Sequence, residues 1–250
     1  RHLPQQAARG VMYVRNGVIM AGSRPAYSVI MPVERKKNTL SDEELDRLAA
    51  LLKVKPEDIK KKIDDNKLAF GAIYLANDVG IDVATQIEEK KDDFPGIEIE
   101  VNPLRVYPLG AAGAQVLGYV GEAGPDDRDA EGNPYKTATL VGRSGLERQY
   151  NKFLEGKNGS KTVEVNASGQ PVRYVEGTPA VSGNNVRLTL DANLQKAAED
   201  AMESQVRTLA HSGVFPTGAS AVAIDPNTGA VLAMASWPSY DPNHFSKGIT

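Results

Sequence analysis

Apolar residues recur along the chain with two spacings, one typical of strands and one typical of helices. Near the N-terminus they alternate on either side of Arg15-Asn16-Gly17, and an Asn-Gly pair between alternating runs predicts a β-hairpin. Further strands are predicted at Pro25–Pro32, Phe70–Leu75, Ile97–Val101, Thr162–Val165, Val172–Val175, Val186–Leu190, Gly218–Ile224 and Ala230–Ala235.

Three helices are predicted between the strands of the N-terminal half. Ser41 and Glu44 form a capping box that predicts the start of the first helix. Pro56 is well placed as the first residue of the second helix, and Asp82–Lys91 has the spacing of a third. Residues 33–96 therefore predict a small α/β lobe inserted between the strands of a different unit.

The stretch Val141–Gly159 combines turn glycines with an amphipathic helix. Gly142 and Gly145 precede the helix, and Glu147 lies in its first turn, where a carboxylate faces the positive end of the helix dipole. Apolar residues at i, i+4, i+7 and i+8 predict a stripe that packs against a core. That stripe consists of Leu146, Tyr150, Phe153 and Leu154.

The C-terminal part has its own pattern of helix and strands. Asp191 predicts the N-cap of a helix that runs to about Leu209, and Ala111–Leu117 predicts a helix of small residues. The linker-like composition of Thr178–Asn185 predicts a boundary, which divides the chain into residues 1–182 and 183–250. Strands with separate helices predict an α+β fold. The inner face of the C-terminal helix is predicted to carry Leu194, Ala197, Ala198, Ala201 and Met202.

Composition narrows the classes of function. The apolar fraction of 41% and charged fraction of 24% are those of a globular protein, and a net charge of −3 argues against nucleic acid as a partner. With no cysteine and three widely spaced histidines, neither a disulfide nor a metal site is expected. No nucleotide-binding motif is present, so no cofactor is expected. From the residues alone, the chain shows no active site.

Three motifs and a C-terminal stretch, in this order, resemble class B penicillin-binding proteins. The first motif contains Arg9-Gly10 and Arg15-Asn16-Gly17, the second is Arg105-Val106-Tyr107-Pro108-Leu109-Gly110, and the third is Gly142–Glu147. Residues 219–245 resemble the first hairpin of the transpeptidase domain, and the ending from Asp241 resembles the elongation type. The motif residues are Arg9, Gly10, Arg15, Asn16, Gly17, Arg105, Tyr107, Pro108, Gly110, Gly142, Gly145 and Glu147.

The resemblance implies a β-rich pedestal of the dimerisation type with an inserted head lobe. The opening strand, helix and hairpin of a penicillin-binding domain would follow. It implies a serine D,D-transpeptidase that cross-links peptidoglycan stem peptides during cell elongation. A membrane anchor before Arg1 would hold the protein on the extracytoplasmic face of a bacterial membrane. The implied partners are a SEDS-type glycosyltransferase and a scaffold protein of the elongation machinery.

The catalytic motifs of that family are missing from these residues. The chain contains no Ser-x-x-Lys and no Lys-Thr-Gly, and Ser182-Gly183-Asn184 lies in the predicted linker. We therefore expect an ectodomain piece with no catalytic residues that does not bind penicillin or stem peptides alone. The alternative is a scaffold of the cell-wall machinery that was never catalytic.

Two structural expectations follow from the resemblance. Because three motifs far apart in sequence must share a physical constraint, Arg9 or Arg105 is expected to pair with Glu147. The inserted lobe is expected to bind a partner and to hinge near Pro32 and Pro103. In one respect the sequence departs from the family, since Val14 stands where the first motif usually carries an acid.

Overall fold

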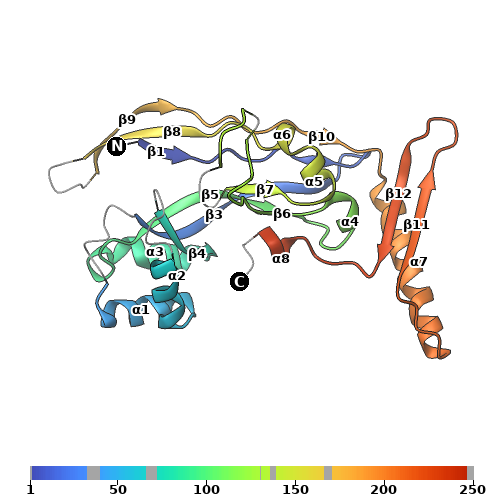
Figure 1. The fold of residues 1–250 in the computed structure, drawn as a ribbon, viewed down its shortest axis with the longest axis horizontal. Helices are drawn as coiled ribbons and strands as arrows, with labels where there is room; N and C mark the ends of the chain where they lie inside the picture. The colour runs from blue at the N-terminus through green and yellow to red at the C-terminus, as the bar shows by residue number, and fades with distance from the viewer. Residues whose placement is uncertain are drawn as a thin grey trace. The chain divides into compact units, whose positions relative to one another are not determined.

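The computed structural model describes residues 2–32, 40–65, 72–129, 131–135, 139–165 and 171–246. These residues combine strands with separate helices, which confirms the α+β prediction (Figure 1). Along this described part of the chain, no helix is both long and apolar enough to cross a membrane.

The strands and helices have the following bounds. The strands are β1 (His2–Gln5), β2 (Met12–Tyr13), β3 (Ile19–Pro32), β4 (Ala72–Val79), β5 (Glu98–Val106), β6 (Val120–Glu122), β7 (Leu140–Gly142), β8 (Gly159–Val165), β9 (Pro171–Thr178), β10 (Val186–Arg187), β11 (Ala219–Ile224) and β12 (Val231–Trp237). The helices are α1 (Asp42–Leu52), α2 (Pro56–Asp65), α3 (Ile81–Glu89), the 3₁₀ turn η2 (Lys91–Asp93), α4 (Ala114–Leu117), α5 (Gly145–Gln149), α6 (Asn151–Leu154), α7 (Ala192–His211) and α8 (Asn243–Ser246).

The described residues fall into two compact units. Residues 25–104 form one unit, and the segments before and after them form the other. The first unit is wider than the lobe expected at residues 33–96, because it begins within β3 and ends within β5. The further division between residues 182 and 183 stays a prediction.

The predicted N-terminal hairpin is present. β2 pairs antiparallel with the start of β3, with Met12 opposite Ala21. β3 then continues as one strand of 14 residues, whereas the sequence predicts a separate strand beginning at Pro25. Proline cannot donate a ladder hydrogen bond, but Pro25 lies between the part of β3 that pairs with β2 and the part that pairs with β4 from Tyr27 onward. The strand therefore passes through it.

The unit of residues 25–104 has its own core beneath capped helices. The amide of Glu44 donates to Ser41 Oγ at 3.3 Å, and the amide of Ser41 donates to Glu44 Oε2 at 2.7 Å, which confirms the capping box. α2 begins at Pro56, as predicted. The buried core consists of Val29, Met31, Leu45, Leu48, Ala49, Ile59, Ile73, Leu75, Ile87, Phe94 and Ile97.

The other unit is built from short antiparallel sheets and one parallel pair. β1, β8 and β9 lie side by side in one sheet, β6 pairs with β7, and β10 runs parallel to β2 (Figure 1). The β8–β9 hairpin was predicted, although its turn at residues 166–170 lies outside the described residues. The buried core of this second unit consists of Met12, Val14, Met20, Ala21, Tyr107, Leu117, Leu154 and Leu190. Val14 is thus a core residue here.

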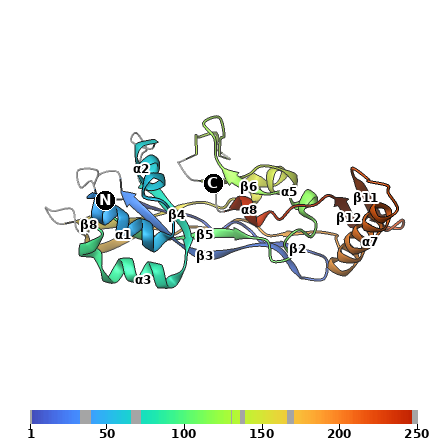
Figure 2. The same ribbon diagram turned by 90° about the horizontal axis from the view of Figure 1, so that it is seen from below.

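The C-terminal helix α7 packs against the β11–β12 hairpin (Figure 2). Asp191 caps α7 as predicted, because its carboxylate accepts from the amides of Asn193 and Leu194. The predicted inner face is wrong at three positions, since Leu194 is 39% exposed and Ala197 and Ala201 are exposed as well, whereas Ala198 and Met202 are partly buried. The buried positions are instead Gln195 and Val206.

A polar contact explains the register of α7. The Gln195 amide accepts from the Met234 amide at 2.8 Å and donates to the Met234 carbonyl at 2.9 Å, so a polar side chain occupies the inner face. The helix predicted at Ala111–Leu117 is shortened to α4. Gly113 has a φ of 65°, in the left-handed region, so it cannot be part of a right-handed helix, and α4 begins after it.

Candidate functional site

The candidate site is built around two short helices where the sequence predicts one. Tyr150 separates α5 from α6. The side chains that turn inward are Glu147, Asn151 and Leu154, at i, i+4 and i+7, and Glu147 and Leu154 are fully buried. The predicted apolar stripe is therefore wrong at two positions, since Tyr150 is 39% exposed and Phe153 is 60% exposed. The inner face carries a carboxylate.

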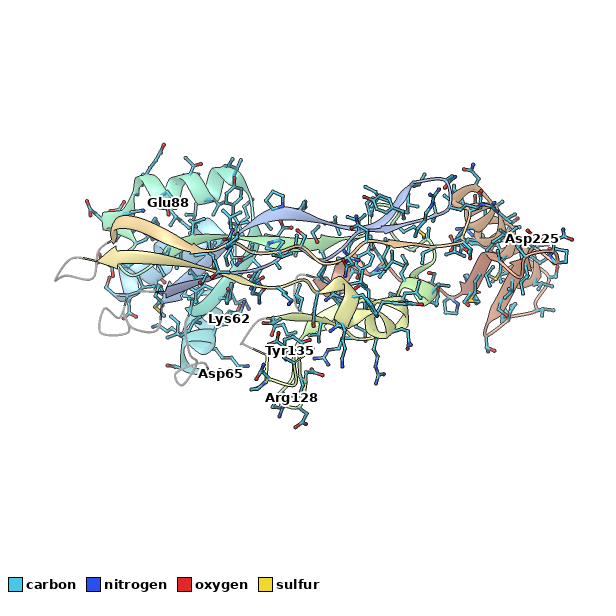
Figure 3. The ribbon with its side chains drawn as sticks, turned by 90° about the horizontal axis from the view of Figure 1, so that it is seen from above. Lys62, Asp65, Glu88, Arg128, Tyr135 and Asp225 are labelled. Atoms are coloured by element: carbon cyan, nitrogen blue, oxygen red, sulfur yellow. The ribbon has the colours of Figure 1, made fainter. Side chains whose placement is uncertain are left out.

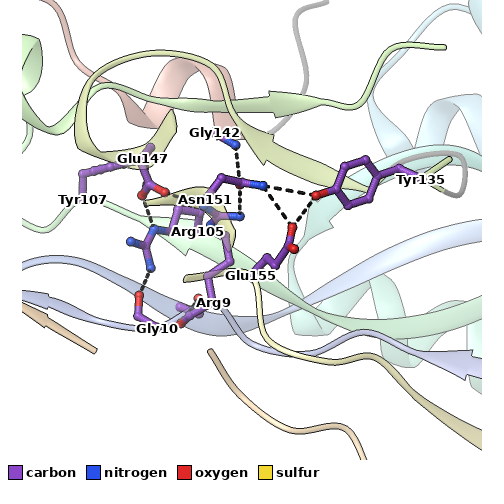
Figure 4. A network of polar contacts seen from close by, with 10 residues as sticks. Arg9, Gly10, Arg105, Tyr107, Tyr135, Gly142, Glu147, Asn151 and Glu155 are labelled. Carbon is purple, nitrogen blue, oxygen red and sulfur yellow. Dashed lines mark hydrogen bonds and ion pairs between the residues drawn. The ribbon is translucent and has the colours of Figure 1, made fainter. Parts of the chain in front are cut away.

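Glu147 is shared by two arginines. Its Oε2 accepts from Arg9 Nη2 at 2.8 Å, and its Oε1 accepts from Arg105 Nε at 2.7 Å and from the Tyr107 hydroxyl at 3.2 Å (Figure 4). The side chain of Glu147 has no solvent exposure, and that of Arg9 is 7% exposed. The predicted ion pair is confirmed, and it involves both arginines.

Arg105 also joins the N-terminal segment directly. Its Nη1 donates to the carbonyl of Gly10 at 2.7 Å, and its guanidinium carbon lies 6.0 Å from the centre of the Tyr107 ring. Arg105 is 95 positions from Gly10 and 42 from Glu147 in the sequence. One buried side chain therefore connects the end of β5, the segment before β2 and helix α5.

Asn151 extends the cluster outward. Its Oδ1 accepts from Arg9 Nη1 at 3.0 Å and from the Gly142 amide at 2.9 Å. Its Nδ2 donates to Glu155 Oε2 at 3.0 Å and to the Tyr135 hydroxyl at 3.2 Å, and that hydroxyl donates to Glu155 (Figure 4). Tyr135 comes from the loop between β6 and β7 that also carries Arg128 (Figure 3). We call Arg9, Arg105, Tyr107, Glu147, Asn151, Tyr135 and Glu155 the ion cluster.

Sequence reasoning missed the outer members of the ion cluster. Asn151 lies one helical turn after Glu147, and that spacing was the signal available. Tyr135 carried no such signal, because it lies in a stretch of turn-forming residues.

The charges of the ion cluster show what its outer members, Asn151, Tyr135 and Glu155, contribute. Arg9 and Arg105 bring two positive charges, and Glu147 brings one negative charge, so the inner group alone carries an excess positive charge. Asn151 joins Arg9 by hydrogen bonds to a second carboxylate, Glu155, which brings a second negative charge to the ion cluster. Burial is the main cause that raises the pKa of the Tyr107 hydroxyl, with the nearby Glu147 carboxylate adding to it. Tyr107 therefore remains a neutral hydrogen-bond donor at ordinary pH.

Two motif glycines allow the backbones around the ion cluster to touch. A Cβ atom on Gly10 would lie 1.8 Å from the carbonyl oxygen of Asn184. A Cβ atom on Gly142 would lie 2.0 Å from the carbonyl oxygen of Glu147. Both neighbours are backbone atoms that cannot turn away, so a side chain at either position would force the segments apart.

The remaining motif residues lie apart from the ion cluster. Arg15, Asn16 and Gly17 are exposed in the turn between β2 and β3, and Pro108 is exposed in the turn that contains Gly110. Gly145 is the first residue of α5.

The residues of the ion cluster are suited to holding chain segments together. It places no serine or other nucleophile beside a base, and its charged groups face one another. Within the described ranges, no group of three or more histidine, aspartate or glutamate side chains is arranged to hold a metal ion.

The chain belongs to the family of the penicillin-binding protein dimerisation domain, whose model matches residues 4–188. This confirms the resemblance to class B penicillin-binding proteins. The peptidoglycan D,D-transpeptidase MrdA of Escherichia coli strain K12 is 31% identical over 255 residues, which cover 99% of this chain and 38% of MrdA. The stage V sporulation protein D of Bacillus subtilis strain 168 is 28% identical and covers 97% of this chain and 34% of its own length. The chain thus spans less than half of these relatives.

Solved structures share the fold. The complex between the penicillin-binding protein PBP2 and MreC from Helicobacter pylori matches with a TM-score of 0.73 at 26% identity, over 100% of this chain and 45% of that chain. Penicillin-binding protein 2X from Streptococcus thermophilus matches with a TM-score of 0.59 at 22% identity, over 100% of this chain and 37% of that chain. At that lower identity the match speaks for the fold alone.

Proposed function

We propose that this chain is the pedestal, and the beginning of the catalytic domain, of a peptidoglycan D,D-transpeptidase of the elongation type. The observation that carries the proposal is the ion cluster: Arg9, Arg105 and Glu147 come from the three family motifs and meet in one buried group. The pedestal extends to about residue 182, and residues 183–250 open the transpeptidase domain. The ion cluster would hold the segments of the pedestal in one arrangement, which a domain that supports another domain requires.

The reaction of the full-length protein would be acyl transfer by a serine. The serine hydroxyl attacks the carbonyl of the donor stem peptide and passes its proton to a base. The bond to the terminal D-alanine then breaks, its amine takes up a proton and leaves, and the serine remains acylated. An acceptor amine then attacks the ester, forms the cross-link and releases the serine. The 250 residues contain neither Ser-x-x-Lys nor Lys-Thr-Gly, so these groups would belong to the remainder of the protein.

The cellular setting follows from the same proposal. A membrane anchor would place the protein on the extracytoplasmic face of the bacterial membrane. The partners would be a scaffold protein of the MreC type and a SEDS-type glycosyltransferase. The lobe predicted at residues 33–96, which lies within the compact unit of residues 25–104, would be the part that binds a partner, and its hinge is predicted near Pro32 and Pro103.

Labelling with a fluorescent β-lactam tests the proposal. We expect the full-length protein to form a covalent adduct that unlabelled penicillin prevents, and the 250-residue chain to form none. The matched control is the full-length protein with the serine of its Ser-x-x-Lys motif replaced by alanine. A full-length protein without that motif, or without an adduct, would favour a scaffold that was never catalytic. An adduct on the 250-residue chain would contradict the assignment of the catalytic residues to the remainder of the protein.

A further inference from the structure

A C-terminal segment, residues 238–246, is held by side chains against the turn and helix that follow β5. The Ser239 hydroxyl donates to the carbonyl of Ala111 at 3.0 Å. The Phe245 ring stacks on the Tyr119 ring, with 4.2 Å between their centres. These contacts join stretches more than a hundred residues apart in the chain, and both stretches belong to the same compact unit.

Asn243 makes the most specific of these contacts. Its Oδ1 accepts from the Tyr107 amide at 2.9 Å, and its Nδ2 donates to the Tyr107 carbonyl at 2.9 Å. Only a side-chain amide offers a donor and an acceptor in this arrangement. Asp241 orients it, because its Oδ1 accepts from Asn243 Nδ2 at 2.7 Å and from the Asn243 amide at 2.9 Å.

Tyr107 is therefore held from two sides. Its hydroxyl donates to Glu147 in the ion cluster, and both of its backbone polar groups bind Asn243. Tyr107 is 1% exposed; its bond to Glu147 is buried, and its bonds to Asn243 are partly buried. The buried tyrosine is the point where the ion cluster and the C-terminal segment meet.

We infer that Asn243 is a positioning residue that fixes the start of the transpeptidase domain to the ion cluster through Tyr107. This inference rests on the proposed function. The C-terminal segment follows β12 without belonging to a sheet, so its path depends on side-chain contacts of this kind. Asn243 fixes the position of the C-terminal segment against the pedestal. That position determines where the following part of the catalytic domain begins.

Asn243→Ala in the full-length protein tests the contact itself. The Tyr107 amide loses its acceptor, so its hydrogen exchange should become about tenfold faster or more, as measured by mass spectrometry on the peptide that contains it. Asn193→Ala is the matched control, since Asn193 is exposed on α7. Unchanged exchange at Tyr107 in Asn243→Ala would overturn the inference.

The rate of acylation by a fluorescent penicillin tests the positioning role. Expressed per folded molecule, with the folded fraction taken from circular dichroism, the rate should fall about tenfold in Asn243→Ala and stay unchanged in Asn193→Ala. A normal rate combined with faster exchange would show a purely structural contact and overturn the positioning role. A wild-type protein that is never acylated would instead refute the proposed function, and the exchange measurement would still decide whether Asn243 holds Tyr107.

Discussion

Glu147 is a buried carboxylate whose stability depends on its partners. Removing such a group from water is costly, and the attraction of a single cation repays that cost only in good geometry. Here two guanidinium groups and one hydroxyl occupy its oxygens at distances of 2.7–3.2 Å. Well-packed apolar residues could give similar stability, so we expect the main contribution of the ion cluster to be a unique arrangement of the segments it joins.

Tyr107→Phe separates the hydrogen bond from the burial of the ring. At neutral pH the variant should lose about 1–2 kcal/mol of unfolding free energy, because one hydrogen bond to Glu147 is gone. In the wild type, the pKa of Tyr107 is raised above its ordinary value of 10.0, so its stabilising contribution is complete below about pH 10 and is lost as the pH rises further. The gap between the unfolding free energies of the two proteins should therefore stay constant up to about pH 10 and narrow as the pH rises further in denaturant titrations. A gap that widens would contradict this account.

The sequence predicts part of the ion cluster and misses the rest. The pairing of arginine with Glu147 follows from motifs that resemble a known family. The roles of Asn151, Tyr135 and Glu155 depend on the break at Tyr150 and on the path of a surface loop, and neither is encoded in local periodicity.

Among the elements, helix α1 is stabilised at its start by the capping box of Ser41 and Glu44. Ser41→Ala should cost about 1 kcal/mol of unfolding free energy, because the Glu44 amide loses its acceptor at the first turn. Glu44→Gln is the matched variant and should cost much less, since glutamine also completes a capping box. Chemical denaturation measures both. A loss in Glu44→Gln as large as that in Ser41→Ala would mean that the charge of Glu44 stabilises α1 as much as the Ser41 cap does.

Elements defined by caps were predicted better than elements defined by apolar faces. The starts of α1, α2 and α7 follow from Ser41, Pro56 and Asp191, each of which acts within one turn. The inner face of α7 was misjudged because Gln195 is buried by bonds to a strand far along the chain. Periodicity cannot anticipate a buried polar side chain whose partner is distant.

At the scale of the molecule, each of the two units has its own hydrophobic core. Leu48→Ala should lower the unfolding free energy by about 2–5 kcal/mol and raise hydrogen exchange mainly within residues 25–104. Leu154→Ala is the matched change in the other core and should spare those residues. Uniform loss of protection across the chain in both variants would contradict two separate cores.

The α+β fold and an inserted lobe could be predicted from the sequence, because strands and capped helices segregate along it. The residue bounds of the lobe could not be predicted, because β3 and β5 each continue from one unit into the other without a local change of sequence pattern. The lobe's hinge and the boundary near residue 182 stay predictions.

The most direct test of the ion cluster is a double-mutant cycle of Arg9→Met and Glu147→Gln, measured by the unfolding free energy of the chain. Glu147→Gln alone should cost about 3–5 kcal/mol, because two buried guanidinium groups lose their counter-charge. Glu203→Gln, at an exposed pair with Arg207 on α7, should cost at most about 1 kcal/mol. The account predicts that the double variant departs from additivity by about 1–3 kcal/mol. Additive losses, or a Glu147→Gln cost no larger than that of Glu203→Gln, would contradict it.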